Sequence, residues 1–405
     1  MQSSAVPGEG VVSPIRGASG AAFLVALAHG VNDIYTAFLP PLLPRIMEKL
    51  GLSIALAATL AMTLSISASL LQPAMGLAAD RYGRRTFVIV GPLFTGVFLS
   101  LIGPAPSFGA LLLCLALGGL GSAAFHPPGA SLAARAEEGK GSGLRLSLFS
   151  FGGSVGYATG PLIAVGIVAW LGLERLWVAM LPVLLLAPML HRILPAAAAP
   201  RQAAPPPALR GVLRMLRGPL GLIFGISAAS AFVQRVFLTM EPIAMAAAGA
   251  TEAAGALMLT TYLAGQAFGS LTGGVLADHV DRRRLLFALT GLAFPAHLLA
   301  LGLPGGSAPA LAAAFAAGLI NMAILPPIVI MAQEIVPAGA AAGSGIAMGL
   351  AWATGSIGVL AVGALGDAVG ARTAALMAVP VVLLGTALAL HPALYGHRRP
   401  AGAGA

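Results

Sequence analysis

The sequence GLAADRYGRR at residues 76–85 returns in altered form as GVLADHVDRR at residues 274–283. Both stretches have a glycine, an aspartate four residues later and a pair of arginines after three more residues, and their aspartates are 198 positions apart. A second landmark has nearly the same spacing, because the proline pair at 127–128 is followed by another at 326–327. Two landmarks with one spacing indicate that the chain consists of two halves that share one fold.

The composition indicates the environment of this fold. Of the 405 residues, 58% are hydrophobic and only 9% are Asp, Glu, Lys or Arg, whereas the surface of a soluble protein is roughly 25–35% charged. So few charges cannot cover a soluble body of this size, and the abundance of apolar residues is the opposite of what disordered chains show. The sequence therefore predicts a multi-pass membrane protein, and the net charge of +9 is not interpreted as nucleic-acid binding.

Apolar segments long enough to cross a bilayer, about 20 residues each, follow one another along the whole chain. They are continuous and longer than the alternating segments of about ten residues that form β-barrels. We predict an all-α membrane protein with twelve transmembrane helices in two pseudo-symmetric six-helix bundles. The predicted spans are 18–47, 53–79, 86–104, 107–136, 143–171, 175–194, 218–246, 252–277, 285–303, 308–336, 341–366 and 371–391.

Polar segments and the distribution of basic residues predict the domains and the orientation. Residues 195–217 carry clustered prolines and arginines, a composition typical of a linker. We expect a cytoplasmic N-terminal tail at 1–17, an N-terminal six-helix bundle at 18–194, a cytoplasmic linker at 195–217, a C-terminal six-helix bundle at 218–391 and a cytoplasmic C-terminal tail at 392–405. Both termini are expected in the cytoplasm because basic residues gather on that side, and only five of the 22 fall elsewhere: Arg45, Lys49, Arg175, Arg235 and Arg372.

The paired loops, the twelve spans and the central linker resemble the major facilitator superfamily over essentially the whole chain. Four segments give a closer resemblance to the fosmidomycin-resistance branch of that superfamily, whose members are drug exporters of the bacterial inner membrane. These segments are HGVND at 29–33, SLLQP at 69–73, FHP at 125–127 and QEIVP at 333–337. The resemblance implies the major facilitator fold, a bacterial inner-membrane location and transport by alternating access of the two halves. Pro128 stands where members of this branch tend to have an acidic residue.

The repeated loops are candidates for a conformational latch. A glycine lets neighbouring helices approach closely, and an aspartate can accept charge-assisted hydrogen bonds from a helix terminus or an arginine of the same loop. Such a latch can hold one conformation of a transporter and break in the other; the alternative is that the arginines only fix the orientation. The expected latch residues are Gly76, Asp80, Arg81, Gly83, Arg84, Arg85, Gly274, Asp278, Arg282, Arg283 and, at the end of the tenth span, Glu334.

The fifth predicted span contains a G-x-x-x-G-P pattern formed by Gly156, Gly160 and Pro161. The pattern is similar to the core of a signature found in proton-coupled drug antiporters, although Ala164-Val165 replaces the glycine pair expected after it. The residues alone predict a face of small side chains for close helix packing, with Pro161 bending the helix.

Ionisable side chains inside a bilayer are costly and usually functional. Asp33 lies near the middle of the first span, His29 lies one turn earlier on the same face, and His126 lies in the fourth span. Because an imidazole can share or relay a proton, Asp33, His29 and His126 are the candidates for proton coupling. Two alternatives stay open: His29 and Asp33 could be a structural hydrogen-bonded pair, and His126 could contact substrate or satisfy a carbonyl freed by the prolines that follow it.

Arg235 and its neighbour Gln234 lie midway along the seventh span. The repeat spacing places the counterpart of Asp33 at position 231, one turn from Arg235, and in the superfamily that the chain resembles these two spans line the cavity. The planar guanidinium could bind an anionic group of the substrate, could neutralise Asp33, or could serve helix packing. Further candidates for substrate binding are Asn32, Gln266 and Asn321, whereas three charged residues toward the outer ends of spans are expected to be solvated: Glu241, Asp367 and Arg372.

We expect a proton-coupled secondary transporter that exports a small amphiphilic or anionic compound. The alternatives are an uptake carrier for an organic acid, sugar or metal chelate, and a receptor or scaffold without transport. The sequence lacks the G-x-x-x-x-G-K-[ST] loop of ATP-driven proteins and any soluble segment long enough for a catalytic domain. We therefore expect no enzyme activity, no catalytic residues, no cofactor and no metal site. The expected partners are a small-molecule substrate, protons and the lipid bilayer, with no nucleic acid and a monomeric chain.

Overall fold

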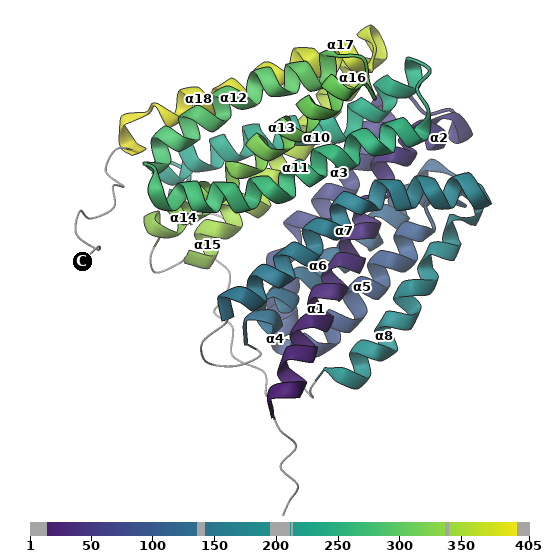
Figure 1. The fold of residues 1–405 in the computed structure, drawn as a ribbon, viewed down its shortest axis with the longest axis vertical. Coiled ribbons are helices and arrows are strands. Elements are labelled where there is room, and N and C mark those ends of the chain that lie inside the picture. The colour runs from purple at the N-terminus through teal and green to yellow at the C-terminus, as the bar shows by residue number, and fades with distance from the viewer. Residues whose placement is uncertain (1–13, 136–141, 195–210, 212–213, 337–339, 395–405) are drawn as a thin grey trace, which may run out of the picture.

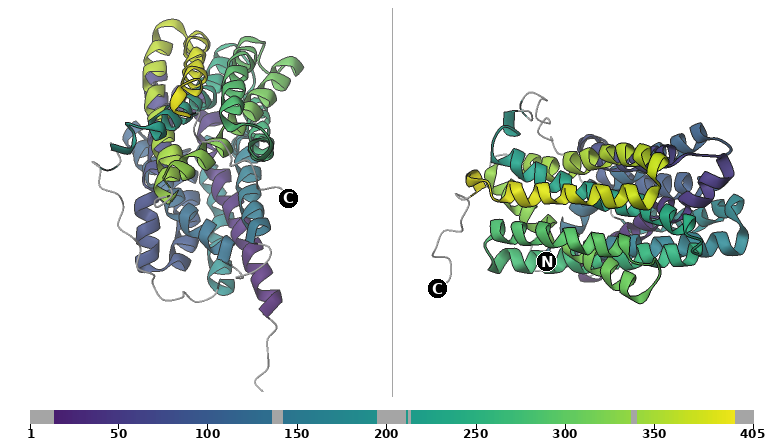
Figure 2. Two further views of the ribbon diagram at one scale, coloured as in Figure 1. Left: turned by 90° about the vertical axis from the view of Figure 1, so that its left-hand side faces the viewer. Right: turned by 90° about the horizontal axis from the view of Figure 1, so that it is seen from above.

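The computed structural model describes residues 14–135, 142–194, 211, 214–336 and 340–394. Within these ranges the regular elements are helices and no strand occurs, which confirms the predicted all-α fold. Figure 1 shows two helical bundles that follow one another in the sequence, one purple to teal and one green to yellow, and the left view of Figure 2 also has the green-to-yellow helices above most of the purple-to-blue ones.

The described part of the N-terminal bundle contains eight α-helices and one 3-10 helix, and two of the α-helices are parts of one bent span. A span is broken before α4, where Pro73 has no backbone N–H to offer, and α3 and α4 meet there at 43°. The elements are α1 (Pro14–Thr36), α2 (Leu39–Leu50), α3 (Ile54–Leu70), α4 (Gln72–Tyr82), α5 (Arg84–Ser100), α6 (Phe108–Arg135), α7 (Ser142–Leu171), η1 (Leu173–Met180) and α8 (Leu181–Ile193).

The C-terminal bundle repeats this order with different breaks. The proline pair at 326–327 divides one span into two helices, and a five-residue π-helix interrupts another. The elements are α10 (Pro219–Ala247), α11 (Glu252–His279), α12 (Arg282–Gly302), α13 (Ala308–Ala323), α14 (Leu325–Ile335), α15 (Ala340–Gly345), the π-helix η3 (Ile346–Leu350), α16 (Ala351–Val369), α17 (Ala371–Ala378), η4 (Val379–Val381), α18 (Val382–Ala389) and η5 (Pro392–Leu394).

The helices agree with a multi-pass membrane protein. Among the described residues, eight segments are long and apolar enough to cross a bilayer, and α3 with α4 would make a ninth as one bent span. Each of the twelve predicted spans coincides with a helix or with consecutive helices, so twelve spans are consistent with the structure. Most of the predicted linker at 195–217, and most of the two predicted tails at 1–17 and 392–405, lie outside the described residues.

The two bundles meet at one end and diverge toward the other (Figure 1). We call the end near α2 and α17 the joined end, and the end that carries the loops at 80–85 and 278–283 the basic-loop end. Helix α3 packs against α16 and α7 packs against α11, and both contacts join the two halves. Small residues permit this approach, since a Cβ added at Gly363 would lie only 2.6 Å from the Cβ of Ala58.

Charged groups connect the halves at the joined end. The carboxylate of Asp367 on α16 accepts hydrogen bonds from the backbone N–H groups of Ile54 (2.7 Å) and Ala55 (3.2 Å), so it caps α3 from the opposite half. Arg45 in the middle of α2 forms an ion pair with Glu252 on α11, with 2.5 Å between Nε and Oε1. These contacts hold the joined end closed in this conformation.

Candidate functional site

A cavity of about 400 Å³ lies between the two halves, a size suited to a small molecule. Its walls come from α1, α2, α3, α4, α6 and α7 of one half and from α10, α11, α13, α14, η3 and α16 of the other. The structure brings six of the predicted site residues to this cavity: His29, Asp33, His126, Gln234, Arg235 and Gln266.

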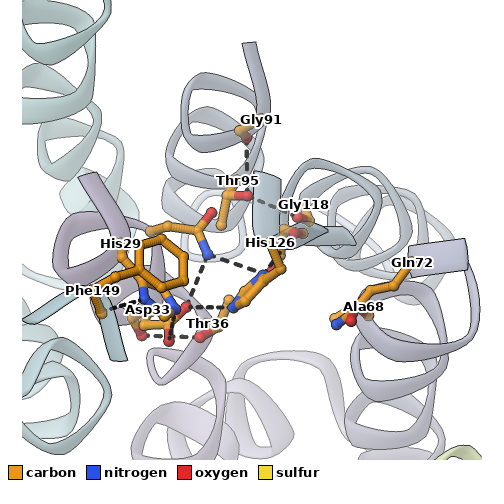
Figure 3. A network of polar contacts seen from close by, with 12 residues as sticks. His29, Asp33, Thr36, Ala68, Gln72, Gly91, Thr95, Gly118, His126 and Phe149 are labelled. Atoms are coloured by element: carbon orange, nitrogen blue, oxygen red, sulfur yellow. Dashed lines mark hydrogen bonds and ion pairs between the residues drawn. The ribbon is translucent and has the colours of Figure 1, made fainter. Parts of the chain in front are cut away.

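Two histidines face the carboxylate of Asp33 from two sides (Figure 3). Nε2 of His29 lies 3.3 Å from Oδ2 of Asp33, and Nε2 of His126 lies 3.4 Å from Oδ1. The other ring nitrogen of each histidine faces a backbone carbonyl, with His29 Nδ1 2.7 Å from the oxygen of Phe149 and His126 Nδ1 2.8 Å from that of Ser122. A carbonyl only accepts hydrogen bonds, so each Nδ1 carries a hydrogen and each Nε2 is turned toward Asp33.

This arrangement has room for protons between the rings and the carboxylate. An imidazole that donates from Nδ1 and is neutral has only a lone pair at Nε2, and an ionised carboxylate also only accepts. Each of the two contacts with Asp33 therefore becomes attractive when one proton lies between nitrogen and oxygen. We call His29, Asp33 and His126 the His–Asp–His cluster; its geometry can hold one or two protons in the wall of the cavity.

Neighbouring groups fix the position of the cluster. Asn32 is fully buried, and its Nδ2 donates to Asp33 Oδ1 (2.9 Å) and to Ser122 Oγ (3.3 Å). The ring of Phe149 stacks on the ring of His29 with centroids 4.0 Å apart. Asn32 does not line the cavity, so the structure places this predicted substrate-binding residue behind Asp33 as a positioning residue.

The glycines of α7 allow it to lie directly on α1. A Cβ added at Gly156 would lie 2.0 Å from the carbonyl oxygen of Gly30, and one at Gly160 would lie 2.5 Å from that of Ile34. Gly153 leaves the space for the ring of His29, because a Cβ there would come within 2.4 Å of the imidazole. The small-residue face of α7 thus sets the position of α1 and of the cluster; Pro161 lies within the same helix.

Arg235 faces the cavity from α10, on the opposite half. Its Nη1 lies 3.4 Å from the hydroxyl of Tyr157 on α7, and its buried Nε has no hydrogen-bond partner. Beside it, Nε2 of Gln234 donates to Oε1 of Gln266 at 3.0 Å. No ion pair joins Arg235 to Asp33 or to another acid in the part of the chain that the structure describes, so the guanidinium has capacity to bind a further group.

The two halves carry the same polar contact with its partners exchanged. In the first half Asn32 donates to Ser122 on α6. In the second half Asn321 on α13 donates to the carbonyl and the hydroxyl oxygens of Ser230 on α10, at 3.1 and 3.0 Å. Ser230 is 198 positions after Asn32, and Asn321 is 199 after Ser122, so the pairs are equivalent by the repeat. Asn321 therefore holds α13 against α10 and does not line the main cavity.

The charged groups of the cavity do not follow this symmetry. At the repeat spacings of 198 and 199, the residues equivalent to His29, Asp33 and His126 are Ser227, Ala231 and Leu325. These three residues line a small pocket of about 10 Å³ in the second half. Arg235 in turn corresponds to Ala37 in the first half. Each half thus contributes a charge that the other lacks.

The expected latch residues of the first loop make contacts within the first half. The carboxylate of Asp80 accepts a hydrogen bond from Arg84 Nε at 2.6 Å, and Arg84 Nη1 donates to Ser131 Oγ on α6, also at 2.6 Å. Arg85 donates to the carbonyl of His191 at the end of α8. The remaining three are Gly76, where a Cβ would lie 3.4 Å from that of Pro127, Arg81, which lies over the ring of Tyr82, and Gly83, whose φ of 104° favours glycine.

The second loop makes comparable contacts within the second half. Arg282 Nη1 lies 2.5 Å from Oε1 of Glu334 at the end of α14, and Arg283 Nε donates to the carbonyl of Ala389 at 2.8 Å. Asp278 lies in the last turn of α11, and a Cβ added at Gly274 would meet open space.

Some residues of the site have no clear signal in the sequence. Tyr157 contacts Arg235, and the only hint is that it is a polar aromatic beside Gly156. Met348 and Trp352 reach the cavity from the π-helix η3 and from α16. The backbone carbonyl of Ala347 in this π-helix accepts a hydrogen bond from Ser227 at 2.5 Å, a change in helical register that periodicity does not predict.

The structure contradicts the prediction made for Glu241. The sequence predicts that it is solvated, but it is fully buried on α10 and neither carboxylate oxygen has a hydrogen-bond partner. Both α2 and α17 pack against α10, so this helix is covered by neighbours from both halves. Arg372, the nearby base, donates instead to the carbonyls of Leu301 and Leu303.

The sequence is similar to one family model and to proteins from two bacteria. The family model described as Major Facilitator Superfamily matches residues 25–234 and 220–404. The Fosmidomycin resistance protein of Escherichia coli (strain K12) is 28% identical over 357 residues and 85% of each chain. The Uncharacterized MFS-type transporter YfnC of Bacillus subtilis (strain 168) is 31% identical over 367 residues and 86% of each chain.

The solved structures add a likeness of fold. A bacterial homologue of the human lysosomal transporter Spinster, in an inward-facing and occupied conformation, superposes with a TM-score of 0.78. The match covers 93% of this chain and 96% of that chain at 18% sequence identity, and it therefore concerns the fold alone.

Proposed function

This chain belongs to the Major Facilitator Superfamily and is a membrane transporter rather than an enzyme, and from this premise we propose that it exports a small anionic or amphiphilic compound in exchange for protons. One observation carries the proposal: a single cavity holds the His–Asp–His cluster on one half and Arg235 on the other. The first can hold protons and the second can bind an anion. Alternating access of the two halves would then expose both to each side of the membrane in turn.

The proton side of the proposal rests on the hydrogen-bond geometry of the cluster. Both Nδ1 atoms are engaged by carbonyls, and both Nε2 atoms face the same carboxylate. Uptake of a proton converts opposed lone pairs into a hydrogen bond and removes the negative charge of the carboxylate from the cavity. The equivalent positions of the second half carry no ionisable group, so the proposed coupling site is confined to the first half.

The cargo side rests on Arg235. Its Nε is buried and unpartnered, and a guanidinium offers parallel N–H donors that fit a carboxylate or a phosphonate. The relative named Fosmidomycin resistance protein makes the phosphonate antibiotic fosmidomycin a suitable first probe. Gln234, Gln266 and Tyr157 lie beside the guanidinium and can orient the rest of such a molecule.

The arrangement of the halves supports alternating access. The joined end is closed by contacts between halves, whereas the bundles diverge at the basic-loop end. Because basic residues mark the cytoplasmic side, we propose that this conformation opens toward the cytoplasm and that the loop contacts of Asp80 and Glu334 change in the opposite state. Protonation or anion binding each neutralises one charge of the cavity, which lowers the cost of closing it.

We also propose the finer assignments that the sequence predicts. The functional units are the bundles 18–194 and 218–391 joined by a cytoplasmic linker at 195–217, with cytoplasmic tails at 1–17 and 392–405. The protein would lie in the bacterial inner membrane with both termini in the cytoplasm, and a single chain would suffice because the cavity is formed between halves of one chain.

Drug susceptibility tests this function. The chain is expressed in a fosmidomycin-sensitive bacterium that lacks its own exporter, beside the variants Arg235→Ala and Asp33→Asn. As a matched control, His279→Gln changes an exposed side chain at the end of α11 that is not part of the cavity lining. We expect the native chain and the control to raise the inhibitory concentration and the two cavity variants to lose the effect.

The outcome separates export from uptake. An uptake carrier would lower the inhibitory concentration instead, by increasing accumulation of the drug. No difference between the native chain and Arg235→Ala, at equal amounts in the membrane, would contradict the proposed cargo site.

A further inference from the structure

We propose that the His–Asp–His cluster is also a binding site for a divalent transition-metal ion such as Zn²⁺, a site that the sequence alone does not predict. The donors would be Nε2 of His29, Nε2 of His126 and the carboxylate of Asp33. This proposal does not depend on the proposed function, because it concerns binding of an ion by the purified protein and not transport.

The separations between the donors fit a metal ion between them. The two nitrogen–oxygen distances are 3.3 and 3.4 Å, and the donor atoms of the three side chains all lie within 4.8 Å of one another. A direct charge-assisted hydrogen bond between nitrogen and oxygen is shorter, about 2.7–2.9 Å. Two ligands of one tetrahedral zinc ion, with bonds of about 2.0–2.2 Å, lie roughly 3.3–3.5 Å apart. Each histidine nitrogen already lies at this distance from one carboxylate oxygen of Asp33, His29 from Oδ2 and His126 from Oδ1.

The groups behind the histidines are those that metal-binding histidines have. A metal-bound imidazole typically donates its other N–H to a carbonyl or carboxylate, which fixes the ring and its tautomer. His29 does so to the carbonyl of Phe149, and His126 does so to the carbonyl of Ser122. Asn32 holds the carboxylate of Asp33 through Oδ1. The three donors are therefore oriented by the backbone and by a buried amide (Figure 3).

The cluster is open on one side. The three side chains are part of the cavity wall, and their exposed fractions are 9% for His29, 16% for Asp33 and 27% for His126. An ion can reach them from the cavity, and the fourth coordination position faces the cavity for water or an anionic group.

The donor set selects the class of ion. Two imidazoles and one carboxylate suit zinc and the neighbouring transition metals. Magnesium and calcium prefer a shell made of oxygen atoms and are expected to bind poorly. Because the metal and a proton would occupy the same atoms, a bound ion excludes the proton from the cluster.

Direct titration tests the site. The full-length protein is purified in detergent with an affinity tag that contains no histidine, and Co²⁺ and Zn²⁺ are added. We expect one ion per chain, a visible Co²⁺ absorption band of tetrahedral type that Zn²⁺ abolishes, and no comparable binding of Mg²⁺.

Variants distinguish the cluster from other histidines. His126→Gln and Asp33→Asn should each weaken Zn²⁺ binding at least about tenfold, whereas the control His279→Gln should bind as the native chain does. Zn²⁺ should raise the thermal unfolding midpoint of the native chain and of the control but not that of His126→Gln. A cooperative unfolding transition of His126→Gln without metal shows that this variant is folded. Unchanged affinity in His126→Gln, or an equal loss in His279→Gln, would overturn the proposal whatever the transport assays show.

Discussion

Asp33 on α1 and Arg235 on α10 line one cavity from opposite halves of the chain and form no ion pair with each other in this conformation. The carboxylate is instead held by two histidines, and the guanidinium lies beside a tyrosine with one N–H unpartnered. The carboxylate is then available to protons and the guanidinium to an anionic cargo, and an exchanger holds one or the other in the cavity at a time. This separation is the basis of the exchange that we propose.

Asp33→Asn should abolish transport driven by a pH gradient while leaving cargo exchange. The amide cannot take up the proton that the cluster shares, but it has nearly the same shape and keeps the neighbouring contacts. In proteoliposomes with labelled fosmidomycin, we expect gradient-driven accumulation to fall to the background and counterflow at equal pH to persist. Retained accumulation under a gradient would show that Asp33 is not the coupling group.

Arg235→Lys should bind an anionic cargo much more weakly than the native chain. A lysine keeps the charge but loses the planar pair of donors, and a hydrogen bond to a charged group contributes about 1.5–3 kcal/mol, so we expect roughly a tenfold to hundredfold loss of affinity. Binding of fosmidomycin to the purified protein measures it, and His279→Gln, outside the cavity lining, serves as the comparison that keeps Arg235. Full affinity in Arg235→Lys would argue against recognition of the anion by the planar pair of guanidinium donors.

Asp367→Ala should weaken the joined end and shift the balance between conformations. The carboxylate caps α3 from the opposite half, and loss of a cap costs about 1 kcal/mol, which corresponds to about a fivefold change in the balance. Spin-label distances between the two halves at the basic-loop end measure the shift. Thr251→Ala removes a cap within one half and should leave those distances unchanged; an equal change in both variants would count against a role of Asp367 between the halves.

Gly156→Ala should destabilise the first half, because the added Cβ would lie 2.0 Å from the carbonyl oxygen of Gly30. Overfilling a packed contact costs about 1–3 kcal/mol, and here the obstacle is backbone. Gly166→Ala on the same helix meets nothing within 4 Å and is the matched control. Thermal unfolding of both purified variants is the measurement, and equal midpoints would mean that α1 and α7 can separate without cost.

Local geometry explains which parts of the site the sequence predicts. His29 and Asp33 are one helical turn apart, so their contact follows from the helix itself. The charged residues in apolar spans also stand out in the sequence, because a bilayer tolerates few of them. The contacts of Tyr157 with Arg235 and of Asp367 with α3 depend on how helices from opposite halves are placed, which no local pattern contains.

The same limit explains the polar residues that the structure places away from the cavity. Asn32 and Asn321 look like cavity residues because they are polar and lie in spans that line it, but the rotation of each helix turns them toward a serine of the same half. Glu241 looks solvated by its position along α10 but is fully buried, and α10 is a helix against which α2 and α17 both pack. The rotation of each helix and the helices packed against it, rather than the residue type, decide where these side chains lie.

Proton movement caused by cargo tests the central claim most directly. Purified protein is placed in weakly buffered detergent solution with a pH indicator, and fosmidomycin is added to the native chain, to Asp33→Asn and to Arg235→Ala. Because exchange requires that the cavity hold cargo or protons but not both, the account predicts that cargo releases protons from the native chain, about one per molecule bound, and none from either variant. Binding of fosmidomycin to the native chain without proton release, or equal release from Asp33→Asn, would contradict it.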